Sequence, residues 1–204
     1  MTTRTLAVVS AGLATPSSTR LLADRLAEAT VAALRERGVE ARTEVVELRE
    51  HARDLADHLV TGFPNAALRP VLDAVAGADG LVAVTPIFSA SYSGLFKTFV
   101  DVLDRDALDG TPALLGATAG TARHQLALDH AMRPLFAYLH AAVVPTAVFA
   151  AAEDWGAGGA SHELGVRVDR AGAELAAAVA ARPAAAGPAD PFADVPDFTA
   201  LLSR

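Results

Sequence analysis

Apolar residues follow two spacings along most of the chain: short continuous runs typical of buried strands, and longer stretches with the period of a helix. The short runs predict strands at residues 5–9, 40–48, 81–84, 112–117 and 142–151. The helical period predicts helices at 18–37, 66–76, 94–104, 124–140 and 162–181. The polar segment 49–65 carries Gly62 and Pro64, which interrupt helices, so no helix is expected there.

Strands that alternate with helices predict an α/β fold, with a parallel sheet covered on both faces. A five-stranded, three-layer flavodoxin-like sandwich of strand order 2-1-3-4-5 is the natural small version, and its ligands bind where the strand order reverses, between strands 1 and 3. Residues 1–182 form this domain. The Pro- and Ala-rich residues 183–191 predict a linker, and the apolar tail to residue 204 is expected to dock on its own subunit or a neighbour.

Composition excludes several classes of function. The chain has no cysteine, which rules out disulfides, thiolate zinc sites and cysteine nucleophiles and is compatible with the cytoplasm. A net charge of −7 argues against nucleic-acid binding, and the absence of a long apolar run argues against a membrane span. His124, Asp129 and His130 do not converge on one helix face, so no metal site is expected.

The segment after the third strand combines apolar and hydroxyl residues. Pro86 cannot donate to a sheet and is expected to end the strand. Pro86, Ile87 and Phe88, followed by serines, suit a flat and partly polar ring, and an ordinary βα connection explains the same residues. The next helix has more apolar surface than one sheet contact needs, which predicts a symmetric dimer through Leu95, Phe96, Phe99, Val100 and Leu103.

The loop after the first strand places hydroxyl groups at the start of a helix. Ser17, Ser18 and Thr19 can cap that helix, or bind a phosphate together with its free N–H groups. Ser10, expected to face the same crevice, favours phosphate. No P-loop lysine follows a glycine, and Gly12 alone makes no dinucleotide fingerprint, so a mononucleotide flavin remains the candidate.

The loop after the fourth strand is made of small residues. Its members, Thr118, Ala119, Gly120 and Thr121, allow the backbone to lie flat against a ring. A simple tight turn explains the same residues.

Longer motifs carry a family resemblance. They are S-x-x-L-x-x-P-S-S at 10–18, ADGLVAVTPIF at 78–88, YSGLFKTFVD at 92–101 and ATAGTARHQLALDHAMRP at 117–134. On these segments, residues 4–182 resemble the NAD(P)H-dependent FMN reductases of flavodoxin-like fold. The similarity is greatest to the branch that serves two-component alkanesulfonate and luciferase-like monooxygenases.

The resemblance implies hydride transfer from NAD(P)H to FMN, delivery of reduced FMN to a partner monooxygenase, and a homodimer or homotetramer. The flavin carries the chemistry, so no catalytic side chain is expected. The FMN contacts implied by the resemblance and the loops are Ser10, Leu13, Ser17, Ser18, Thr19, Pro86, Ile87, Phe88, Thr118, Ala119, Gly120 and Thr121.

Two other functions are compatible with the same scaffold: a quinone or azo-dye reductase with tightly bound FMN, and a non-catalytic electron carrier. His130 stands where some alkanesulfonate-type reductases carry a tyrosine inside a π-helical insertion. Its neighbours are ordinary helix formers, which predicts a regular helix here, or at most a weakly distorted one. Trp155 is expected either to shield a neighbouring subunit's flavin or to pack within its own loop.

Overall fold

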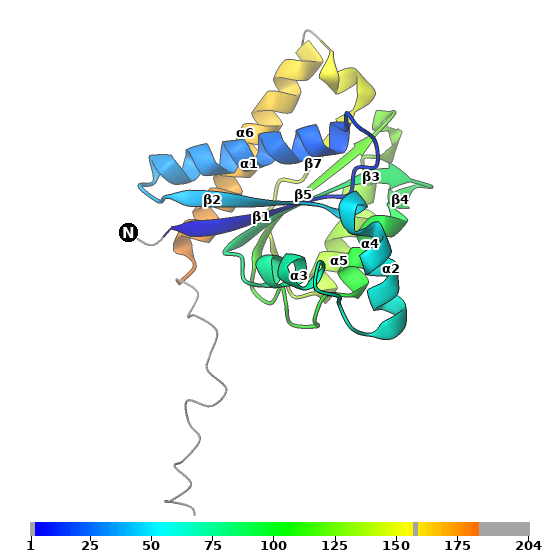
Figure 1. Cartoon of the computed structure of the whole chain (residues 1–204). Coiled ribbons are helices and arrows are strands. Elements are labelled where there is room, and N and C mark those ends of the chain that lie inside the picture. Colours follow the sequence, from blue (N-terminus) through cyan, green and yellow to red (C-terminus); the bar gives the residue numbers. More distant parts are fainter. Residues whose placement is uncertain (1–2, 157–158, 184–204) are drawn as a thin grey trace, which may run out of the picture.

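The computed structural model describes residues 3–156 and 159–183, and its centre is a parallel sheet (Figure 1). The main strands lie in the order β2 (Ala41–Glu47), β1 (Arg4–Ser10), β3 (Gly80–Phe88) and β5 (Pro112–Ala119). β6 (Ala142–Val143) and β7 (Val148–Ala151) both pair with β5 and together take the fifth position. The flavodoxin-like order 2-1-3-4-5 is therefore confirmed. A short strand, β4 (Ser91–Tyr92), runs antiparallel to the end of β3.

Helices cover both faces of the sheet. On one face lie α1 (Ser18–Glu36) and α6 (Gly159–Ala181); on the other lie α2 (Ala52–Thr61), α3 (Arg69–Ala76), α4 (Gly94–Asp101) and α5 (Arg133–Tyr138) (Figure 1). Shorter helical turns are η1 (Leu48–His51), η2 (Ala122–His124), η3 (Leu128–Met132) and η4 (Ala152–Trp155). Within the described ranges, no helix is both long enough and apolar enough to cross a membrane. The predicted linker and tail, from residue 184 onward, lie outside the described residues.

The central strands are buried on both sides, which explains their continuous apolar runs. Along β1, Leu6 and Val8 join the core beneath α1 and α6, whereas Ala7 and Val9 join the core on the opposite face. α1 and α6 pack so closely that a Cβ on Gly172 would stand 2.8 Å from the Cβ of Ala29.

The third strand extends further than predicted, and the expectation that Pro86 ends it was wrong. β1 pairs with β3 only as far as Val84, whose carbonyl accepts a hydrogen bond from Ala11 at 2.9 Å. The backbone nitrogen of Pro86, two residues later, points to the same side as the carbonyl of Val84. The pairing with β1 has ended by then, so the missing N–H of proline costs no ladder bond. It still pairs with Thr118 of β5 on the other side.

The prediction that segment 49–65 forms no helix was also wrong, because α2 lies within it. Leu55 is fully buried and anchors the helix to the core. Gly62 has a φ of 79° and donates its N–H to the carbonyl of His58 at 2.8 Å. This glycine therefore terminates the helix, as glycines at helix ends commonly do, and does not prevent it.

The helix predicted at 124–140 is divided, and the regular helix expected around His130 is absent. Leu128–Met132 forms a π-helical turn, in which the N–H of Arg133 bonds to the carbonyl of Leu128. Pro134 follows at once and has no N–H to continue the α-helical ladder. The wider turn keeps Leu128 and Met132 in the core while His130 stays exposed.

The predicted fifth strand, 142–151, is divided into β6 and β7, and side chains bond to the backbone between them. Arg133 donates to the carbonyls of Val144, at 3.1 Å, and Pro145. The carboxylate of Glu174 accepts the N–H of Thr146 at 2.7 Å and its hydroxyl at 2.8 Å. Val144 still donates its N–H to the carbonyl of Ala113 at 2.9 Å, so the gap in the ladder lies between Pro145, which has no N–H, and Val148, where β7 begins.

The apolar surplus expected on α4 is largely absent. Phe96, Phe99 and Val100 are only 1%, 3% and 5% exposed, because the core of the same chain covers them. Leu95 and Leu103 are half-buried and pack against that core. The apolar surface that predicted a dimer through these residues is therefore mostly covered within a single chain.

Candidate functional site

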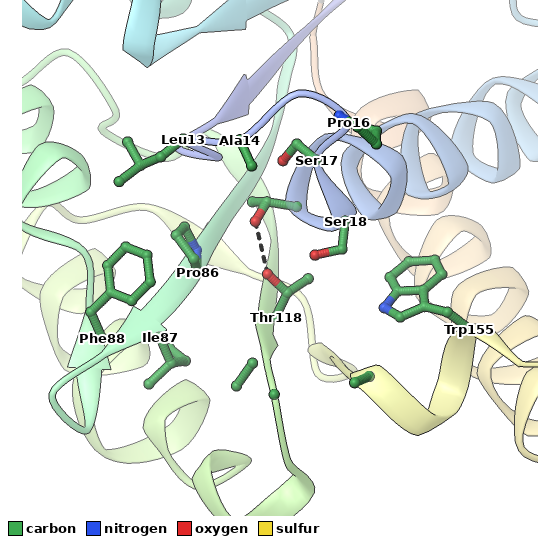
Figure 2. Close-up of a pocket in the computed structure, with 14 residues that line it drawn as sticks. Leu13, Ala14, Pro16, Ser17, Ser18, Pro86, Ile87, Phe88, Thr118 and Trp155 are labelled. Atoms are coloured by element: carbon green, nitrogen blue, oxygen red, sulfur yellow. Dashed lines mark hydrogen bonds between the residues drawn. The ribbon is translucent and has the colours of Figure 1, made fainter.

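A cavity of about 450 Å³ opens at the carboxyl edge of the sheet (Figure 2). The first βα loop, the ends of β3 and β5, and η4 enclose it. Ten of the twelve residues predicted from the sequence line it: Leu13, Ser17, Ser18, Thr19, Pro86, Ile87, Phe88, Thr118, Ala119 and Gly120. The wall is completed by Ala14, Pro16, Ala152 and Trp155.

One end of the cavity is the N-terminus of α1. Ser17 caps this helix, and its Oγ accepts the N–H of Arg20 at 3.2 Å. An accepting oxygen keeps its own proton, so the Ser17 hydroxyl can also donate to a ligand. The N–H groups of Ser18 and Thr19 lie in the first turn and have no acceptor within the helix. Helix capping and anion binding are therefore compatible roles for these residues.

The floor of the cavity joins α1 to β5. The hydroxyls of Thr19 and Thr118 lie 2.8 Å apart, and each residue is 3% exposed (Figure 2). The loop above passes so close that a Cβ on Gly12 would stand 2.1 Å from the Oγ of Ser17. Glycine is thus required there to bring the backbone against the start of α1.

The other end of the cavity is mostly apolar. Pro86, Ile87 and Phe88 form one wall, and Phe88 is 49% exposed at the rim. Thr85, directly before Pro86, ties this wall to the start of α4, because its hydroxyl accepts the N–H of Ser93 at 3.1 Å.

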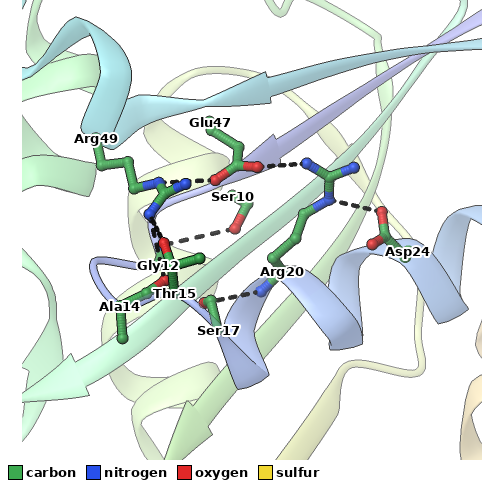
Figure 3. A network of polar contacts seen from close by, with 9 residues as sticks. All are labelled: Ser10, Gly12, Ala14, Thr15, Ser17, Arg20, Asp24, Glu47 and Arg49. Carbon is green, nitrogen blue, oxygen red and sulfur yellow. Dashed lines mark hydrogen bonds and ion pairs between the residues drawn. The ribbon is translucent and has the colours of Figure 1, made fainter.

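Two arginines beside the first loop are held by carboxylates (Figure 3). Arg20 contacts Asp24 at 2.8 Å and Glu47 at 2.6 Å, and Arg49 contacts Glu47 at 2.9 Å. Hydrogen bonding to Asp24 and the nearby negative charges raise the pKa of Arg20 against the opposing effect of burial. Arg49 also donates to the Thr15 hydroxyl and thereby fixes the loop. No charged side chain is among the described residues that line the cavity.

Two predicted residues lie outside the cavity wall. Ser10 is 1% exposed, and its Oγ accepts the N–H of Gly12 at 3.5 Å beneath the loop. Thr121 caps η2 by accepting the N–H of Arg123 at 3.4 Å. Trp155 takes part in the cavity of its own chain, and Ala152 carries no sequence signal that could have identified it.

Parallel strands in the order 2-1-3-4-5, with a cavity where the strand order reverses and the N-terminus of a helix opens into it, define a flavodoxin-like fold. The profile of the NADPH-dependent FMN reductase family matches residues 4–156, and the chain belongs to that family.

Individual relatives agree with this assignment. The chain is 39% identical over 147 residues to an FMN reductase (NADPH) of Pseudomonas aeruginosa, and the matched region covers 72% of this chain and 76% of that relative. It is 41% identical over 142 residues to the NADH-dependent FMN reductase SfnE of Pseudomonas putida, with coverage of 70% and 74%. The solved structure of an oxidoreductase from Corynebacterium diphtheriae superposes with a TM-score of 0.86 at 49% identity, covering 89% of this chain and 99% of that one.

Proposed function

We propose that the cavity binds FMN and presents it to NAD(P)H for hydride transfer. Membership of the family makes this chain an NAD(P)H-dependent FMN reductase. The observation that best supports this proposal is that the two ends of the cavity match the two ends of FMN. Helix N–H groups and serine hydroxyls at one end suit a phosphate, and flat apolar walls at the other suit an isoalloxazine ring.

The side chains of the cavity bind FMN and orient it. Ser17 and Ser18 hold the phosphate, with the N–H groups of the first turn of α1. Pro86 and Phe88 pack on the ring, and the small Gly120 lets the backbone approach its edge. When bound, FMN supplies the ring that accepts the hydride, so the protein needs no acid or base for that step.

Release of reduced FMN to a flavin-dependent monooxygenase is the second part of the proposal. Ser18 is exposed and Phe88 is half-exposed, so both ends of the cavity reach solvent and the ligand can exchange. A chain that uses NAD(P)H and contains no cysteine is suited to the cytoplasm.

A second copy of the chain is proposed to cover the face formed by α4 and α5. This face has a hollow of about 520 Å³, lined by apolar and aromatic residues such as Leu103, Leu135 and Tyr138 and by the charged residues Lys97, Asp101 and Arg105. Tyr138 is 73% exposed there. Isologous dimers are the commonest way to cover such a face. Sedimentation at micromolar concentration tests it, and a fully active monomer would contradict it.

The decisive experiment measures NADH and NADPH oxidation with added FMN, FAD or riboflavin, before and after dialysis. Saturable dependence on added FMN after dialysis is expected for a reductase that releases its product. A protein that keeps its flavin through dialysis and reduces quinones without added FMN would be a quinone reductase. A protein that binds FMN but oxidises neither nucleotide would be an electron carrier.

A further inference from the structure

At the phosphate end of the proposed FMN site, no side chain among the described lining residues carries a formal positive charge. The side chains there are the hydroxyls of Ser17, Ser18 and Thr19, and the indole of Trp155. The hydroxyl of Thr19 is already shared with Thr118 at 2.8 Å. A phosphate dianion needs several neutral donors to replace its hydration, so each remaining N–H or O–H in this wall is significant.

Trp155 offers a donor that the other described residues of the cavity wall do not use. Figure 2 shows the indole nitrogen on the edge of the ring that faces the cavity, on the side of Ser18 and Thr118. None of the other residues that line the cavity accepts a hydrogen bond from this N–H. An indole nitrogen is a donor only, so this N–H can serve a ligand that offers an acceptor.

The indole is held in place by contacts that leave its N–H free. The guanidinium of Arg25, on α1, lies 5.2 Å from the ring centroid, in a cation–π contact. Asp154 fixes the turn η4 by accepting the N–H of Ala151 at 2.7 Å and a bond from Arg167 at 3.3 Å. The donor is therefore pre-organised, and a positive charge stands behind it.

We propose that Trp155 is a phosphate-binding and specificity-determining residue of the flavin site. Its N–H donates to the terminal phosphate of the flavin, and its ring forms the wall beyond that phosphate. FMN, a monophosphate, fits within this wall, whereas the adenylate of FAD must displace the indole. This inference rests on the proposed FMN site and adds a ligand contact to it.

The test compares the dissociation constants of FMN, riboflavin and FAD for wild type, Trp155→Phe and Trp155→Ala by calorimetry. Trp155→Phe keeps one aromatic ring on this wall and removes the donor together with the second ring, so riboflavin binding serves as the internal control for the lost ring surface. FMN binding is expected to weaken about tenfold or more, the usual effect of losing a hydrogen bond to a charged group, and riboflavin binding to change less than about twofold. In Trp155→Ala, the ratio of the FAD to the FMN dissociation constant is expected to fall at least about fivefold, because the wall is removed.

An unchanged FMN dissociation constant in Trp155→Phe, or an equal loss for FMN and riboflavin, would overturn the proposal. Trp155 is the one tryptophan of the chain, so its fluorescence reports on this wall in the wild type, whatever the variants do. Inorganic phosphate should change that fluorescence saturably, FMN should compete with it, and sodium chloride of equal ionic strength should not reproduce it. No saturable change would also overturn the proposal.

These outcomes are distinct from failure of the FMN site itself. If wild type neither binds FMN nor prefers it to riboflavin, the proposed function fails and the inference fails with it. If wild type binds and reduces FMN while Trp155→Phe behaves identically, only the inference on Trp155 fails. Phe63→Leu serves as the matched control, because Phe63 is 78% exposed and outside the cavity.

Discussion

Replacing Ser17 with aspartate separates the two roles of this residue. In the structure its Oγ caps α1 by accepting the N–H of Arg20, and the proposed function gives its hydroxyl proton to a phosphate. Aspartate is as good an N-cap as serine and is favoured by the helix dipole. The free energy of unfolding should therefore change by less than about 0.5 kcal/mol.

The effect on FMN binding follows from charge and hydrogen bonding. Loss of one hydrogen bond to a charged group costs about 1.5–3 kcal/mol. A new carboxylate beside the phosphate adds repulsion of about 4 kcal/mol per pair of unit charges at roughly 4 Å and an effective dielectric constant of about 20, which solvent reduces because Ser17 is only half-buried. A net loss of at least about 3 kcal/mol is expected, or more than a hundredfold in the dissociation constant. Riboflavin, which has no phosphate, should bind within about threefold of wild type.

The assay pairs calorimetric titration of both flavins with urea unfolding. Ser93→Ala is the matched control, because Ser93 caps α4 in the same way, accepting the N–H of Phe96 at 3.2 Å, and does not line the cavity. It should lose about 1 kcal/mol of stability and keep the preference for FMN over riboflavin. Wild-type FMN binding by Ser17→Asp, or equal loss of both flavins, would refute the phosphate site at α1.

Four further changes test other parts of the structure. Phe88→Ala should weaken FMN and riboflavin by the same factor, about three- to tenfold for a lost aromatic contact, and titrations that show unequal losses would contradict a ring-end position. Thr118→Val leaves the buried hydroxyl of Thr19 without its partner and should cost about 1–3 kcal/mol in urea unfolding, part of which the double valine variant should recover. Burial tends to raise the pKa of Glu174, but hydrogen bonds from the β6–β7 connection and a neighbouring arginine lower it overall. The ionised carboxylate therefore stabilises the fold above the pKa of an unfolded glutamate, about 4.3, and this stability is lost as the pH falls through the folded pKa. The difference in unfolding free energy between wild type and Glu174→Gln should accordingly shrink below about pH 4, and a difference independent of pH would count against it. His130→Ala should leave the unfolding free energy within about 0.5 kcal/mol, because the side chain is exposed on the π turn; a larger loss in urea unfolding would mean that the histidine holds that turn.

The sequence by itself determined the class of fold and most of the cavity. Strands such as β1 and β3 are buried on both faces, so their continuous apolar runs mark them without knowledge of any neighbour. The βα loops carry their chemistry in consecutive residues, such as Ser17 and Ser18 at the start of α1, and the sheet order brings these loops to one edge.

Tertiary structure decided the features that depend on distant partners. α2 forms although its segment is polar, because Leu55 meets a core that other elements build. Pro86 remains in β3 because β1 ends beside it, and the π turn forms because Pro134 interrupts the ladder while Leu128 must still reach the core. Trp155 becomes a wall of the cavity only because α6 and α1 hold η4 beside Ser18. Local periodicity reports that a residue is buried, but which distant residues bury it depends on contacts that only the folded chain makes.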